Sequence, residues 1–257
     1  MKVGVNLVNF GPAATPEILT KWAELVEGLG YHHLMTSDHV TITPDVQERF
    51  PAPFYEPLTT LGWLAGITKS ISIGASVIIL PYRSPLEIAR TFSNIDQISG
   101  GRCILGVGVG WARQEYAALN VPFERRGAIA NEYLRVIRQL WTEEVSSFDG
   151  EFIRFDEIHA APMPVQSPHP PIWVGGGSDA ALRRAIRLGD AWHPFRISTD
   201  GLKTDGIPRL CAIAEKEEMP VPPICPRILL RVTDTALPDD ARVACEGSLD
   251  QIHRDLA

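Results

Sequence analysis

One short segment of the sequence combines residues that can move a proton. Ser37-Asp38-His39 directly follows the apolar run Leu34-Met35-Thr36. An imidazole exchanges a proton near neutral pH, and a neighbouring carboxylate favours its charged form. A histidine in an arbitrary loop more often serves only as a cap. Because this one stands at the end of an expected strand, where barrel enzymes place their catalytic groups, we interpret His39 as a candidate acid or base.

Two glycine-rich segments follow other apolar runs and favour the binding of a ligand. Gly175-Gly176-Gly177-Ser178 precedes an expected helix, so its amides would lie at the positive end of a helix dipole and bind a phosphate without a lysine; the alternative is a flexible turn. Gly106 to Trp111 contains a GxGxG pattern without the third glycine and later acidic residue of a dinucleotide fingerprint. We therefore reject a Rossmann site and expect its bare backbone to accommodate a flat ring system.

Two further segments admit more than one interpretation. Gly74-Ala75-Ser76-Val77 puts small residues inside a β-branched strand, which indicates a bulge, a close approach by another group, or tight strand-to-helix packing. Trp192 and His193 end another expected strand and line a candidate substrate pocket, although core packing of the tryptophan is at least as common. A metal site built from His39 and His193 is disfavoured, because neither an HxH pair nor a third carboxylate accompanies them.

The elements that must position these residues follow a repeated pattern. Short apolar runs alternate with helix-period segments that open with a cap and a proline, as at Thr15-Pro16 and Ser84-Pro85, and end at glycines. Strands that are nearly continuous apolar runs indicate a parallel sheet that is buried on both faces. We expect strands near residues 2–8, 33–37, 71–79, 103–109, 171–175, 190–193 and 226–233. The predicted fold class is α/β, a (β/α)8 TIM barrel whose last strand is missing after a helix at 248–256.

The domain prediction is a single barrel over residues 1–257 with two insertions. We expect residues 40–55 to form a lid over the barrel mouth, and residues 148–170 to form a hairpin followed by a proline-rich connector. A net charge of −7 argues against nucleic acid or an anionic membrane as a partner. The four scattered cysteines indicate reduced thiols, and with no expected signal peptide or membrane span they predict a cytoplasmic protein.

Taken together, five groups of motifs resemble the luciferase-like monooxygenase superfamily, in particular its coenzyme F420-dependent oxidoreductases. The resemblance covers nearly the whole chain. It rests on the order and spacing of Ser37-Asp38-His39, Ser76-Val77 with Leu80-Pro81-Tyr82-Arg83, Gly100-Gly101-Arg102 with Gly106 to Trp111, Pro170 to Gly176, and Gly189-Asp190-Ala191-Trp192.

The resemblance implies roles that spacing alone does not. His39 would lie beside the reactive carbon of a deazaflavin ring and Asp38 beside its pyrimidine edge. The Ser76-Val77 peptide would be a non-proline cis bond that supports the ring. The remaining cofactor contacts would come from Gly108, Val109, Gly110 and Trp111 along the ring, and from Gly175, Gly176, Gly177 and Ser178 at the phosphate. Sugar-phosphate oxidising members carry an acidic residue at Trp111, so that substrate class is not expected.

The implied activity is hydride transfer between a small organic substrate and coenzyme F420, with His39 as acid or base and Trp111, Trp192 and His193 in the substrate pocket. An FMN-dependent monooxygenase that uses a partner reductase is the nearest alternative. A non-catalytic flavin-binding or deazaflavin-binding protein and a metal-dependent barrel hydrolase are the others. By the same resemblance we expect a homodimer, with a flavin or F420 reductase as the electron supplier.

Overall fold

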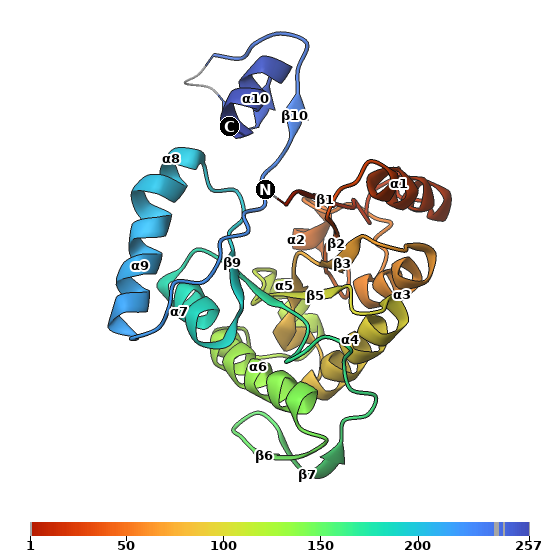
Figure 1. The fold of residues 1–257 in the computed structure, drawn as a ribbon, viewed down its shortest axis with the longest axis vertical. Coiled ribbons are helices and arrows are strands. Elements are labelled where there is room, and N and C mark those ends of the chain that lie inside the picture. Colours follow the sequence, from red (N-terminus) through yellow and green to blue (C-terminus); the bar gives the residue numbers. More distant parts are fainter. Residues whose placement is uncertain (1, 239–241, 244, 257) are drawn as a thin grey trace. The chain divides into compact units, whose positions relative to one another are not determined.

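The structure is a computed structural model that describes residues 2–238, 242–243 and 245–256. The chain divides into two compact units, Met1–Trp173 and Val174–Ala257. The first unit contains most of the parallel strands and the helices that cover them (Figure 1). The expectation of one domain over residues 1–257 stays a prediction.

The parallel sheet of the first unit places the ends of its strands at one edge. Its strands lie in the order β1 (Gly4–Asn6), β2 (His33–Thr36), β3 (Ser72–Ala75) and β5 (Cys103–Gly108). A short strand, β4 (Ile78–Ile79), pairs with β5 beyond the end of β3. Asn6 therefore stands opposite Met35, and Thr36 opposite Ala75. The carboxyl ends of neighbouring strands meet along one edge, as expected for a parallel sheet.

One expected strand, 71–79, is broken into two pieces. The break falls at Ser76-Val77, whose peptide bond is cis, so the non-proline cis bond is confirmed. After β4 a 3-10 turn at Leu80–Tyr82 leads into α4 (Pro85–Ser99). The hydroxyl of Ser84 caps this helix and Gly100 ends it in the left-handed conformation at φ +69°, as its cap and glycine predict.

Six helices flank the described strands of the first unit, and α3, α4 and α6 lie side by side (Figure 1). The six are α1 (Pro16–Gly28), α2 (Pro44–Gln47), α3 (Pro57–Ile67), α4, α5 (Arg113–Ala118) and α6 (Arg126–Thr142). Buried aliphatic and aromatic side chains such as Leu34, Ile73, Leu64 and Phe92 form the core between helices and strands. After α6, β6 (Val145–Asp149) and β7 (Arg154–His159) form an antiparallel hairpin.

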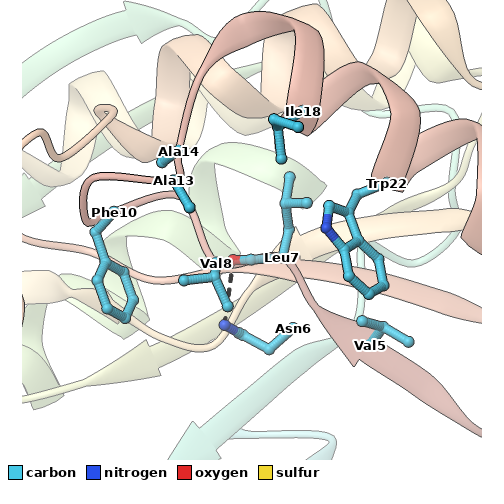
Figure 2. A pocket seen from close by; sticks show the side chains of 9 residues that line it. All are labelled: Val5, Asn6, Leu7, Val8, Phe10, Ala13, Ala14, Ile18 and Trp22. Carbon is cyan, nitrogen blue, oxygen red and sulfur yellow. Dashed lines mark hydrogen bonds between the residues drawn. The ribbon is translucent and has the colours of Figure 1, made fainter.

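The apolar residues of α1 do not share one buried face as their helical period predicts. Leu19 and Val26 are buried, whereas Trp22, Leu25 and Leu29 are about half exposed or more. Trp22 and Ile18 line one wall of a cavity of about 140 Å³ beside β1, whose other walls include Val5 and Leu7 (Figure 2). The helix therefore carries a second apolar stripe in addition to its core face.

The second unit contains the glycine-rich loop and the helices and short strands that follow it. β8 (Ile172–Gly175) crosses the boundary between the units and leads through this loop into α7 (Asp179–Leu188), followed by β9 (Ala191–His193). A short helix, α8 (Thr199–Gly201), and a π-helical turn at Leu202–Gly206 continue into α9 (Ile207–Lys216). The strand expected at 226–233 is wrong for most of its length, because only β10 (Arg231–Val232) forms and it pairs with β11 (Glu246–Gly247). The helix expected at 248–256 is present as α10 (Leu249–Leu256).

Candidate active site

His39 forms a buried pair with a glutamate that the sequence did not single out. Its Nδ1 lies 2.7 Å from Oε2 of Glu115, a residue of α5. The exposed fraction is 5% for His39 and 0% for Glu115. The second oxygen, Oε1, accepts hydrogen bonds from the backbone amides of Val40 at 2.6 Å and Thr41 at 3.1 Å. Each carboxylate oxygen therefore has a partner, and the contact joins the end of β2 to the helix after β5.

Aromatic side chains surround the His39 ring. The ring centroids of Phe50, Phe54 and Trp111 lie 4.9, 5.5 and 6.0 Å from that of the imidazole. Both phenylalanines come from the segment 40–55. From the same segment, the guanidinium of Arg49 lies 4.4 Å above the Trp111 ring. The buried imidazole of His39 therefore lies in a low-dielectric environment.

The segment 40–55 is held against the loop that follows β1. The backbone amide of Gly11 donates to the carbonyls of both Pro51 and Pro53 at 2.8 Å. The buried side chain of Asn9 donates to the carbonyls of Tyr55 and Ser37 at 2.7 and 2.9 Å. Both ends of the segment are thus anchored close to His39, and its function as a lid stays a prediction.

Asp38 is occupied by protein partners. Its two oxygens accept a bidentate pair of hydrogen bonds from Arg83 at 2.7 and 2.8 Å, and one of them also accepts from the Ile79 amide at 2.8 Å. Burial raises the pKa of Asp38, against the opposing effects of Arg83 and Ile79. Arg83 also contacts Glu56, the cap of α3, at 3.0 Å. The pair anchors β4 to the end of β2, and the ring contact implied for Asp38 stays a prediction.

Neighbouring strands require the glycines of β3 and β5. A Cβ at Gly106 would lie 1.9 Å from the carbonyl oxygen of Ala75, and one at Gly74 would lie 2.4 Å from that of Ile104. A Cβ at Gly108 would lie 2.5 Å from the Val77 side chain. Close approach of a neighbouring backbone therefore explains Gly74 and Gly106, and the Val77 side chain explains Gly108, in each case without a ligand. The ring contacts predicted for Gly108, Val109 and Gly110 are not tested by this packing.

The loop Gly175–Ser178 in the second unit opens α7 as its sequence predicts. The Ser178 hydroxyl accepts from the Ala181 amide at 3.3 Å, and Gly176 adopts a φ of +108°. Arg209 of α9 donates to the carbonyl of Gly177 at 3.1 Å and also pairs with Asp179. A side chain at Gly177 would meet no atom within 4 Å. The first turn of the helix thus has an open approach with a guanidinium beside it.

Two arginines of α7 pair with one glutamate, and a third is buried. Arg183 and Arg187 both pair with Glu217. Arg184 is buried, which lowers its pKa. The cation beside the loop is instead Arg209, which lies some thirty residues later in the sequence and could not be placed there by spacing.

Trp192 and His193 are buried in the second unit. The indole Nε1 of Trp192 donates to the Gly176 carbonyl at 2.7 Å, which ties β9 to the glycine-rich loop. Nδ1 of His193 lies 2.5 Å from the carbonyl oxygen of Cys225. Burial lowers the pKa of His193 to about 4, so the ring is neutral at pH 7. The assignment of both residues to a substrate pocket stays a prediction.

The sequence missed the residues that complete the site because their burial depends on distant segments. Glu115 follows Trp111 by four positions, but no local pattern shows that α5 turns this carboxylate toward His39. Arg83 belongs to a recognised motif without an assigned role. The described residues contain no group of three or more potential metal ligands, and none of the described helices is long and apolar enough to span a membrane.

Comparisons with known proteins identify the family of this chain. The family model for luciferase-like monooxygenases matches residues 1–246. An uncharacterised protein of Mycobacterium tuberculosis is 30% identical over 248 residues, 86% of each chain. An FMNH2-dependent dimethylsulfone monooxygenase of Pseudomonas putida is 30% identical over 191 residues, which is 71% of this chain and 50% of that protein.

A solved structure shows the same fold. An F420-dependent secondary alcohol dehydrogenase, in complex with an F420-acetone adduct, superposes with a TM-score of 0.76 at 19% identity, covering 93% of this chain and 70% of the other. The fold is therefore the α/β fold of the luciferase-like TIM barrels, as the alternating strands and helices predict. The chain belongs to the luciferase-like monooxygenase family.

Proposed function

We propose that this protein is an oxidoreductase that transfers a hydride between a small organic substrate and coenzyme F420, with His39 as the proton carrier. The observation that supports this proposal best is the buried contact between His39 and Glu115 at the carboxyl edge of the sheet. A titratable group that is buried beside a carboxylate at such an edge is a frequent arrangement in barrel enzymes.

The polar atoms at this edge fit a flavin-like or deazaflavin-like ring. Asn6 Oδ1 and Thr36 Oγ1, on the last residues of β1 and β2, are buried without a hydrogen-bond partner in the described part of the chain. A buried polar atom without a partner is costly, and such rings carry both hydrogen-bond donors and acceptors along one edge. The open glycine-rich loop that begins α7 in the second unit fits a phosphate by its amides.

In this proposal the residues of the chain transfer the proton and shape the surroundings of the substrate. A bound deazaflavin supplies the carbon that accepts or gives the hydride. His39 takes up or returns the substrate's proton, and its apolar surroundings exclude water from that transfer. Phe50, Phe54 and Trp111 favour a substrate with apolar surface next to the reacting group.

The test begins with parallel binding titrations of F420 and FMN, followed by substrate screening with the preferred cofactor. His39→Asn is expected to bind the cofactor within about threefold of wild type and to lose about 100-fold or more in turnover. Full turnover by this variant with normal cofactor binding would contradict the role of His39. Binding of neither cofactor by the folded protein would contradict the proposal as a whole.

A monooxygenase that uses reduced FMN from a partner reductase is the second candidate. The similarity to the Pseudomonas putida enzyme over 71% of this chain favours it. It predicts preference for FMN in the titration and oxygen consumption that requires both a flavin reductase and the substrate. A non-catalytic binding protein predicts tight binding of either cofactor with no redox turnover across a broad substrate panel.

A further inference from the structure

The helix α5, which carries Glu115, is fixed in place by the adjacent Tyr116. The adjacent Tyr116 donates its hydroxyl to the Val109 carbonyl at 2.6 Å, and its ring packs edge-on against Tyr82 and Phe123 at 4.7 and 5.1 Å. The α5 helix is therefore fixed to the end of β5 and to the turn before α4. The backbone that carries Glu115 is thus fixed, and its carboxylate is held by its contacts with His39, Val40 and Thr41.

The two oxygens of this carboxylate serve different partners. Oε2 contacts His39 Nδ1, whereas Oε1 accepts from the amides of Val40 and Thr41, the first residues of the segment 40–55. A single side chain thus fixes both the imidazole ring and the start of the segment whose phenylalanines cover it. The described part of the chain provides no hydrogen bond to the other imidazole nitrogen, Nε2.

We propose that Glu115 is the positioning residue for His39. The importance of this role for catalysis rests on the proposed function. An ionised carboxylate only accepts hydrogen bonds, so Nδ1 must carry a proton in this contact. The neutral ring is then the Nδ1–H tautomer, and Nε2 is the basic nitrogen that can receive a substrate proton. The same carboxylate stabilises the imidazolium that forms after proton transfer.

Glu115→Gln inverts this arrangement without changing the size of the side chain. Two backbone amides point at the position of Oε1, so the carbonyl oxygen of the glutamine must face them. Its NH2 group then faces His39 Nδ1 and requires an acceptor there. The variant therefore favours the Nε2–H tautomer, in which the nitrogen needed as a base already carries a proton.

Glu132→Gln is a matched control. Glu132 on α6 is also a buried carboxylate, and it accepts from the backbone amides of Glu151, Phe152 and Ile153 at 2.9, 2.7 and 2.9 Å. It has no histidine among these partners. This variant therefore measures how much the loss of a buried carboxylate that anchors a loop changes the protein when that carboxylate has no hydrogen bond to His39.

The primary measurement is the tautomer of His39, read from long-range proton–nitrogen correlation spectra of histidine-labelled protein. His39→Asn identifies its signals among those of the seven histidines. In spectra recorded at a pH high enough for the ring to be neutral, we expect the Nδ1–H pattern in wild type and Glu132→Gln, and the Nε2–H pattern in Glu115→Gln. An Nε2–H pattern in wild type overturns the proposal, and this outcome does not require any variant to fold. An unchanged pattern in a folded Glu115→Gln overturns it as well.

Turnover provides the second measurement. We expect kcat of Glu115→Gln to fall about 100-fold to 10,000-fold with KM within a few-fold of wild type, because a wrong tautomer impairs the proton transfer and not binding. Glu132→Gln is expected to keep kcat within about threefold, since none of its hydrogen bonds involves His39. Wild-type turnover by a tautomer-inverted Glu115→Gln overturns the positioning role. If wild type shows the Nδ1–H tautomer but no redox turnover with either cofactor, only the proposed function fails.

Discussion

Glu27, at the end of α1, stabilises the loop that leads into β3. Its Oε1 accepts hydrogen bonds from the backbone amides of Lys69, Ser70 and Ile71 at 2.9, 2.7 and 3.0 Å, and from the Ser70 hydroxyl at 3.1 Å. A negative charge at a helix C-terminus is otherwise unfavourable, so these donors must more than compensate for it. Glu27→Gln keeps a neutral acceptor at this point and removes only the charge.

The size of the effect follows from the pKa of Glu27. Burial tends to raise this pKa, but the three amides and the hydroxyl outweigh it and lower it from 4.5 to about 2. A difference of about 2.5 pH units corresponds to about 3 kcal/mol, and solvent access at this partly exposed site reduces it to about 1.5 kcal/mol. Because the native pKa lies below the unfolded one, this stability is complete above pH 4.5 and declines as the pH falls toward 2.

The assay is urea unfolding, followed by tryptophan fluorescence, of wild type, Glu27→Gln and the control Glu24→Gln. Glu24 is an exposed carboxylate on the same helix, and its substitution is expected to change the free energy of unfolding by less than about 0.5 kcal/mol. Glu27→Gln should lose about 1.5 kcal/mol at pH 7 and clearly less at pH 3.5. A loss equal to that of Glu24→Gln at pH 7, or a loss that grows at low pH, would refute this reasoning.

Three further substitutions test other parts of the structure. Arg83→Met leaves Asp38 buried without its bidentate partner and should lower the free energy of unfolding in urea by about 3–5 kcal/mol. A decrease of less than about 1 kcal/mol would contradict this expectation. Gly106→Ala puts a methyl group 1.9 Å from a backbone carbonyl oxygen, so a lower thermal midpoint is expected even without cofactor. His193→Asn removes a buried imidazole whose pKa is lowered to about 4. Because that native pKa lies below the unfolded one, wild type should lose stability as the pH falls from about 6.5 to 4, and the variant should lose clearly less across this window.

Local patterns predicted the parallel strands and the helix starts well. Thr15-Pro16, Ser84-Pro85 and Ser178-Asp179 all open helices as expected, because capping depends on residues only a few positions apart. The predictions fail where tertiary contacts decide which residues pair or become buried. The apolar run 226–233 pairs only at Arg231–Val232, and the apolar residues of α1 separate into a buried and an exposed stripe.

The features of the candidate site likewise fall into those that the sequence determines and those that only the tertiary structure decides. The sequence alone determined that His39 stands at the end of a parallel strand and that Gly175–Ser178 precedes a capped helix, since both follow from short-range periodicity and turn chemistry. Only the tertiary structure decided that Glu115 holds His39 and that Arg83 occupies Asp38, because these partners lie 76 and 45 positions away in the chain. Burial and partner choice depend on how separate strands and helices pack together, and no local pattern of residues encodes that packing.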